Sequence, residues 1–120
     1  MIKVVIESPF AGDVQRNLRY LRACMRDCLL RGETPYASHA LYTQPGVLRD
    51  DVPEERKLGM EAGFVWGASA DKVVLYEDLG ITEGMRRGVL RARERGQVIE
   101  HRMLDARVLY VVMQEPGNDY

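Results

Sequence analysis

Apolar residues in this chain occur in two patterns, short continuous runs and longer stretches with spacings of three and four. The runs Ile2–Ile6 and Asp71–Tyr76 are rich in β-branched residues and end at polar or turn residues, which predicts two buried strands. The helical spacing predicts an amphipathic helix that is capped by Asp13, runs to about Arg31 and ends at Gly32. Its expected inward face consists of Val14, Leu18, Leu21, Met25 and Cys28.

Two further helices are marked by start signals as well as by spacing. Asp51 as the expected N-cap, followed by Pro53 and two glutamates, predicts a helix that continues to about Gly67. Its expected inward residues are Leu58, Ala62 and Val65. Thr82 is the predicted N-cap of a helix that ends near Arg95, with Met85, Val89 and Ala92 inward.

The remaining segments complete an alternating order of strands and helices. Short strands are predicted at Thr34–Ser38, Val98–Leu104 and Arg107–Met113, with a loop at His39–Asp51 and a flexible tail over residues 113–120. Strands that alternate with helices predict an α/β fold with a mainly parallel sheet of four to five strands and helices on both faces.

Composition limits the classes of protein that need consideration. The 120 residues are 46% hydrophobic and 29% charged, which indicates one globular domain over residues 1–120. A net charge of −1 argues against nucleic-acid binding through bulk charge. The 14 arginines against 3 lysines suggest anionic ligands or ion pairs, although a coding bias explains the same ratio. Four of these arginines form one expected solvent-exposed stripe on the first helix: Arg16, Arg19, Arg22 and Arg26.

Potential metal ligands are few. Cys24 and Cys28 share a helix face and are expected to be buried thiols in a reducing compartment. His39 and His101 are far apart in the sequence, so we expect neither a metal nor another cofactor. No apolar run approaches the length of a membrane span, so a cytoplasmic protein without membrane contact is expected.

Two loops are expected at the carboxyl edge of the sheet, where parallel α/β folds bind ligands. The loop Glu7–Gly12 leads into a helix N-terminus, which favours an anion, but it has no Walker or GxGxxG pattern. The loop Glu77–Glu83 contains Asp78 and Glu83, which suit general acid–base catalysis or contacts with sugar hydroxyls. Simple turn formation and helix capping by Thr82 are the competing explanations.

Two other features carry open alternatives. His39, in a polar and aromatic stretch, can polarise or protonate a substrate or can be structural. Phe64 and Trp66 lie near the end of a predicted helix and favour core or dimer contacts over a stacking surface.

Several segments form a recognisable combination, namely Ile6–Asp13, Gly32–Gln44, Pro53–Arg56 and Asp78–Met85, with Asn17, Tyr20, Gly59 and Trp66. Over nearly all of Ile2–Leu104, the chain resembles a small family of uncharacterised proteins common in bacteriophages and prophages. That family is in turn similar to the nucleoside 2-deoxyribosyltransferase-like group. The resemblance implies a flavodoxin-like three-layer sandwich, cleavage or transfer of a base–sugar bond, and homodimers or higher homo-oligomers. A phage-encoded protein would work in the host cytoplasm.

The resemblance also implies roles for individual residues. The first loop would bind the substrate, and Asp78 would hold the sugar. The group's nucleophilic glutamate corresponds to Gly88 in this chain, so Glu83 and Asp78 are the remaining catalytic candidates. The predicted ligand-binding residues are Ser8, Pro9, Phe10, Gly12, Ser38, His39, Tyr42, Arg56, Gly80, Thr82, Gly84 and Met85. Arg56, Arg86 and Arg87 are the arginines most suited to contact a phosphate.

Three functions follow as hypotheses. The first is a phage-type protein that binds a nucleoside or nucleotide and so sequesters or senses a nucleotide-derived small molecule. The second is an N-glycosidase or deoxyribosyltransferase that uses Asp78 or Glu83. The third is a structural or protein-interaction component of a phage.

Overall fold

The structure, a computed structural model, describes residues 1–114. Its elements in chain order are β1 (Ile2–Glu7), α1 (Val14–Leu30), β2 (Glu33–Tyr36), α2 (Ser38–Leu41), α3 (Pro53–Gly67), β3 (Lys72–Tyr76), α4 (Glu83–Glu94), β4 (Val98–Arg102) and α5 (Ala106–Met113). The predicted tail at 113–120 lies outside the described residues except for Met113, which closes α5, and Gln114.

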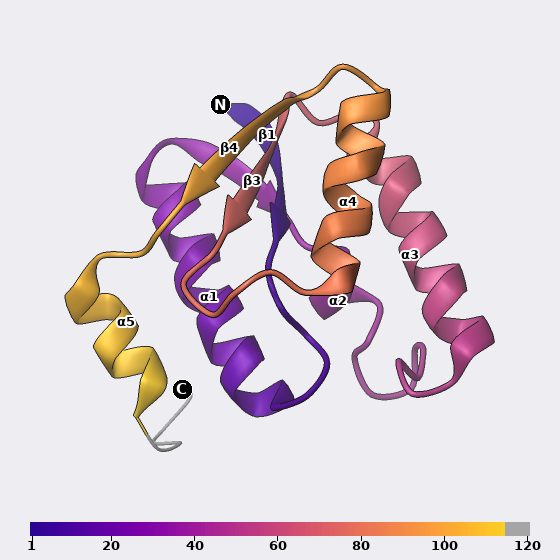
Figure 1. Cartoon of the computed structure of the whole chain (residues 1–120), viewed down its shortest axis with the longest axis horizontal. Coiled ribbons are helices and arrows are strands. Elements are labelled where there is room, and N and C mark those ends of the chain that lie inside the picture. Colours follow the sequence, from indigo (N-terminus) through magenta and orange to yellow (C-terminus); the bar gives the residue numbers. More distant parts are fainter. Residues whose placement is uncertain (115–120) are drawn as a thin grey trace.

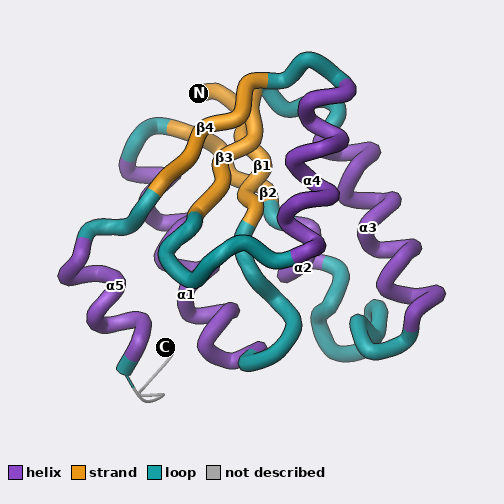
Figure 2. Tube along the Cα trace, in the orientation of Figure 1, coloured by secondary structure: helices purple, strands orange, loops and turns teal. Residues whose placement is uncertain are grey.

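The four strands form a parallel sheet in the order β2-β1-β3-β4. Helices α1 and α5 lie on one side of the sheet, and α3 and α4 lie on the other (Figures 1 and 2). The α/β fold with helices on both faces is therefore confirmed, and the architecture is consistent with a flavodoxin-like fold. The chain leaves β1 toward β2 on one side and reaches β3 on the other, so the switch point of strand order lies between β1 and β3.

Alternation along the strands divides the core between the two faces. Val4 and Ile6 of β1 face α1, where they pack in one apolar cluster with Tyr20, Leu21, Cys24 and Cys28. The opposite face has a smaller cluster of Leu75, Met85 and Val89, with Ile99 packed against it. The burial of both cysteines and the inward position of Met85 and Val89 are as predicted. The smaller cluster leaves the α3 and α4 side less filled.

A buried ion pair joins the two edge strands of the sheet, β2 and β4, on the side of α1. The guanidinium of Arg102 donates to both carboxylate oxygens of Glu33, at 2.7 Å and 2.6 Å. Lys72 and Glu100 extend the network, since the Lys72 amine lies 3.2 Å from Glu33 and 2.9 Å from Glu100. These contacts hold the pKa of the Glu33 carboxyl at about 2. Arg102 therefore serves the fold and is not available to a ligand.

Two secondary-structure predictions are wrong. Residues predicted as the strand Arg107–Met113 form α5, because Asp105 caps a helix there and Leu109 and Val112 pack against α1. Their valine-rich composition favours a strand only in isolation, and tertiary contacts override it. The segment predicted as the loop His39–Asp51 begins with the short helix α2, which brings His39 into contact with Ser8 beyond the end of β1.

The inward face of α3 also differs from the prediction. Leu58 and Val65 are exposed, as is Trp66, and the residues that turn inward include Gly63 and Gly67. Glycine adds nothing to a hydrophobic pattern, so the spacing of apolar residues indicated the wrong side of this helix. Val52, rather than Asp51, is the N-cap, whereas Thr82 caps α4 as predicted.

Candidate functional site

A cavity of about 310 Å³ lies between the sheet and the helices α3 and α4, beside the switch point of strand order. This volume is at the lower end of the range of small-molecule sites, roughly 300–1,000 Å³. Glycines in the wall allow neighbouring side chains to approach closely. A β-carbon at Gly63 would lie 2.5 Å from the Ser38 hydroxyl, and Gly67 and Gly88 likewise present only backbone to the cavity.

Five parts of the chain line the cavity. They are the end of β1 and the loop after it (Val5, Glu7, Ser8, Phe10, Ala11), α2 and the loop after it (Ser38, His39, Asp50), α3 (Arg56, Met60, Gly63, Phe64, Gly67), α4 with its N-cap (Thr82, Glu83, Gly84, Met85, Gly88, Arg91), and β3 with the turn between α4 and β4 (Val73, Arg95, Gln97). The first loop is held in shape by the buried Asn17 of α1, whose amide donates to the carbonyls of Phe10 and Ala11. Gly12 permits the turn into α1 with a φ of +99°.

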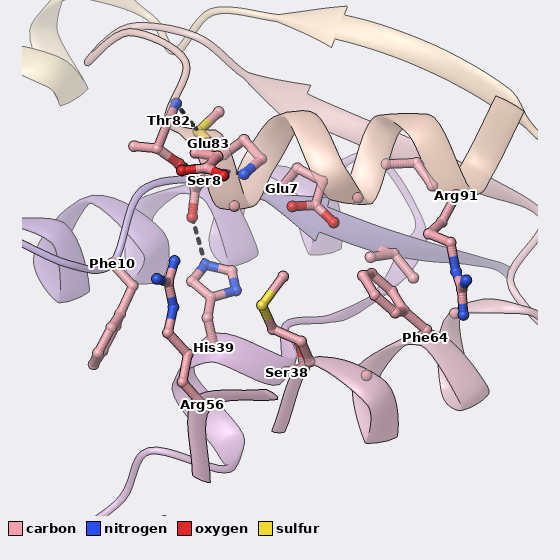
Figure 3. A pocket seen from close by; sticks show the side chains of 18 of the residues that line it. Glu7, Ser8, Phe10, Ser38, His39, Arg56, Phe64, Thr82, Glu83 and Arg91 are labelled. Atoms are coloured by element: carbon pink, nitrogen blue, oxygen red, sulfur yellow. Dashed lines mark hydrogen bonds between the residues drawn. The ribbon is translucent and has the colours of Figure 1, made fainter. Parts of the chain in front are cut away.

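Ser8 and His39 form a hydrogen-bonded pair at one end of the cavity. The Ser8 hydroxyl lies 2.8 Å from Nε2 of His39, so the pair joins β1 to α2 (Figure 3). Burial lowers the pKa of His39 to about 4, because the charged imidazolium loses its hydration. At neutral pH the imidazole is uncharged and offers one donor and one acceptor nitrogen.

The Glu7 carboxyl points into the middle of the cavity (Figure 3). Within residues 1–114 it has no hydrogen-bond or ion-pair partner, and burial raises its pKa to about 8. The ionised form is disfavoured because burial removes part of its hydration and no cation within residues 1–114 pairs with it. At neutral pH the cavity thus contains a carboxylic acid that retains its proton.

Arginines from both helices surround the opening. Arg56 of α3 reaches the start of α4, where its Nη2 lies 3.7 Å from the position of a methyl group on Gly84. The guanidinium of Arg91 on α4 lies 4.7 Å from the centre of the Phe64 ring on α3. Arg95 also donates to the Phe64 carbonyl. The two helices are therefore connected by long cationic side chains that leave the space between them open.

A comparison with protein families matches most of the chain. Residues 2–102 match the family described as a domain of unknown function (DUF7768). The chain belongs to this family. The DUF7768 domain thus includes all four strands and every residue that lines the cavity. A search of curated proteins found no match.

Nine of the predicted site residues of the DUF7768 domain line the cavity: Ser8, Phe10, Ser38, His39, Arg56, Thr82, Glu83, Gly84 and Met85. Pro9, Gly12, Tyr42, Asp78 and Gly80 do not line it. Gly80 instead allows the turn before α4, with a φ of +89°. The two loops predicted to share one edge of the sheet therefore do meet, and α2 adds His39 to them.

The two carboxylates predicted to be catalytic are both engaged. Asp78 accepts a hydrogen bond of 2.6 Å from the Tyr20 hydroxyl and one of 3.0 Å from the Leu104 amide, so it ties α1 to the end of β4. Glu83 borders the cavity, but it is exposed and pairs with Arg87 at 2.8 Å. A structural role accounts for Asp78, which capping alone did not explain.

The sequence did not single out Glu7, Phe64 or Arg91 as site residues. Glu7 ends a buried strand, and strand alternation places it on the face of Val5, away from α1. The available signal was the combination of this parity with Gly88 on the helix that covers the same face. Within the described residues, no group of three histidine, cysteine, aspartate or glutamate side chains is arranged to hold a metal. No helix there is long and apolar enough to cross a membrane.

Proposed function

We propose that this cavity binds a nucleoside or nucleotide. The observation that carries the proposal is the combination of a mainly apolar cavity lining with arginines at the opening, located at the switch point of a parallel sheet. Ligands of α/β folds bind at this position, and a nucleotide needs both an apolar surface for its base and cations for its phosphate. The resemblance to the nucleoside 2-deoxyribosyltransferase-like group supports the same ligand class.

Arg56 is the residue best suited to a phosphate. From α3, its guanidinium reaches the start of α4, where backbone amides and the helix dipole also favour an anion. Its nearest carboxylate partner is Asp50 at 3.8 Å, a loose ion pair that leaves guanidinium donors free. The Phe64 side chain, between Arg91 and the interior, offers a flat apolar surface for a base.

Isothermal titration calorimetry with nucleosides, nucleotides and ADP-ribose derivatives tests the proposal. We expect at least one member of the panel to bind, with Arg56→Ala weakening the phosphorylated ligands by about tenfold or more. Arg86→Ala is the matched control, since Arg86 is exposed on the first turn of α4 and does not line the cavity. Absence of binding across the panel would refute the proposal and favour a structural or protein-interaction role.

Cleavage or transfer of a base–sugar bond is a second candidate function. It is favoured by the Glu7 carboxyl group inside the cavity, which has no partner in the part of the chain that the structure describes, in addition to the two carboxylates considered from the sequence. Incubation with deoxynucleosides and deoxynucleoside monophosphates, followed by chromatography, measures the released base. Binding without base release would leave the first function and exclude this one.

A further inference from the structure

Glu7 and Gly88 fit together as a pair. A β-carbon placed on Gly88 would lie 2.1 Å from Oε2 and 2.4 Å from Cδ of Glu7, much closer than any real contact. The carboxyl group of Glu7 therefore fills the space in which a side chain at position 88 of α4 would begin. The carboxyl group in this part of the cavity therefore comes from the end of β1 and not from α4.

We infer that Glu7, held in the gap beside Gly88, is the proton donor of this cavity. The inference rests on the proposed ligand class and assigns a residue to the chemistry of the same site. A proton donor must have a free O–H directed at the ligand, and the Glu7 carboxyl points into the cavity without a partner among residues 1–114 (Figure 3).

The other carboxylates of the cavity lining do not meet this requirement. Asp50 pairs with Arg56, and Glu83 pairs with Arg87 at the exposed start of α4. Burial also raises the pKa of Glu7 to about 8, so that the acid form is present at neutral pH. The titratable or charged side chains that share the cavity with Glu7 are His39, Asp50, Arg56, Glu83, Arg91 and Arg95.

The chemistry that this arrangement suits is hydrolysis of a base–sugar bond. The Glu7 carboxylic acid donates its proton to a nitrogen or oxygen of the leaving base while the bond from C1′ to the base nitrogen breaks. The electron pair of that bond leaves with the base. Water, the second substrate, adds to C1′ and returns a proton to the Glu7 carboxylate. The products are the free base and the sugar, and the enzyme regains its initial state.

The variant Glu7→Gln separates proton donation from binding. Glutamine has the size and the neutrality of a protonated glutamate. The affinity of the variant for the intact nucleoside, measured by calorimetry, should therefore stay within about threefold of the wild-type affinity. Base release should fall by about 100-fold or more, the usual contribution of a general acid. Glu94→Gln, at the exposed end of α4 and outside the cavity lining, is the control and should match the wild-type protein.

The outcomes are distinguishable. A Glu7→Gln variant that releases base at the wild-type rate overturns the inference, and so does a wild-type protein that binds nucleosides without cleaving any of them. In both cases the proposed binding function stands, whereas absence of binding removes both. A second measurement needs no variant: NMR titration of the carboxyl carbons should show one glutamate with a midpoint near pH 8. Absence of any glutamate midpoint well above the ordinary value would contradict the assignment.

Discussion

The hydroxyl of Ser8 and the Nε2 atom of His39 lie 2.8 Å apart, and this contact connects the end of β1 to α2 across one end of the cavity. Both residues come from segments that the sequence marked as candidates, but they are 31 positions apart along the chain. The buried imidazole has a pKa of about 4, lowered by the loss of hydration of its charged form. Its protonation therefore opposes folding.

The first prediction concerns this imidazole. The unfolded chain binds a proton at His39 near its ordinary pKa of 6.5, while the folded chain does so only near 4, so stability contributed by this group falls as pH decreases from 6.5 to 4. Relative to wild type, His39→Gln should gain roughly 2 kcal/mol in unfolding free energy between pH 7 and pH 5. Urea denaturation at both pH values measures it. A stability difference between the two proteins that is the same at both pH values would contradict the prediction.

The second prediction concerns Glu7, whose effect has the opposite sign. Its folded pKa of about 8 exceeds the ordinary 4.5, so stability is greatest below pH 4.5 and decreases as pH rises toward 8. Between pH 5 and pH 8 the wild-type protein should lose roughly 3–4 kcal/mol relative to Glu7→Gln. Between pH 5 and 7 the effects of His39 and Glu7 on stability have opposite signs and partly cancel. Each single variant must therefore be compared with the wild-type protein. A constant difference between the two proteins across this range would contradict the prediction.

A third prediction tests the contact between Glu7 and Gly88. Gly88→Ala favours the helix by about 1 kcal/mol but introduces a methyl group where the Glu7 carboxyl lies, and such overpacking costs about 1–3 kcal/mol. We expect the single variant to be destabilised or unchanged. In a Glu7→Ala background the same substitution should be stabilising, and a double-mutant cycle by chemical denaturation gives the coupling. Equal effects in both backgrounds would show that the side chains do not meet.

The fourth prediction concerns the buried pair of Arg102 and Glu33. Arg102→Met leaves the Glu33 carboxylate buried with only Lys72 to compensate it, so the unfolding free energy should fall by about 3–5 kcal/mol. Replacing both residues, with Glu33→Met added, should cost less than the single substitution, because no uncompensated charge remains. Ligand affinity should not change in folded variants, since neither residue lines the cavity. A double variant less stable than either single one would argue against this view.

Local signals determined most of the secondary structure. The runs of β1 and β3 and the caps of α1 and α4 are encoded within a few residues of each element, and all were predicted within one or two positions of the observed bounds. The segment of α5 was not, because its helix is favoured by packing against α1, which lies 76 or more positions earlier in the chain. The order of parallel strands also placed both candidate loops at one edge.

The site was determined only in part by the sequence. Alternating strands and helices place ligands at the carboxyl edge of the sheet, and this rule made the loop that contains Ser8 a candidate, whereas His39 was named for its chemistry and Arg56 with the resemblance. Whether a cavity exists, and which carboxyl enters it, depends on the distance between α3, α4 and the sheet. Glycines at 63 and 88 leave room for the side chains of Ser38 and Glu7 at the cavity wall, and an absent side chain produces no periodic signal in a sequence. The position of Glu7 became meaningful only when folding brought it beside Gly88, because burial of its carboxyl, without a partner in residues 1–114, is a property of the assembled structure.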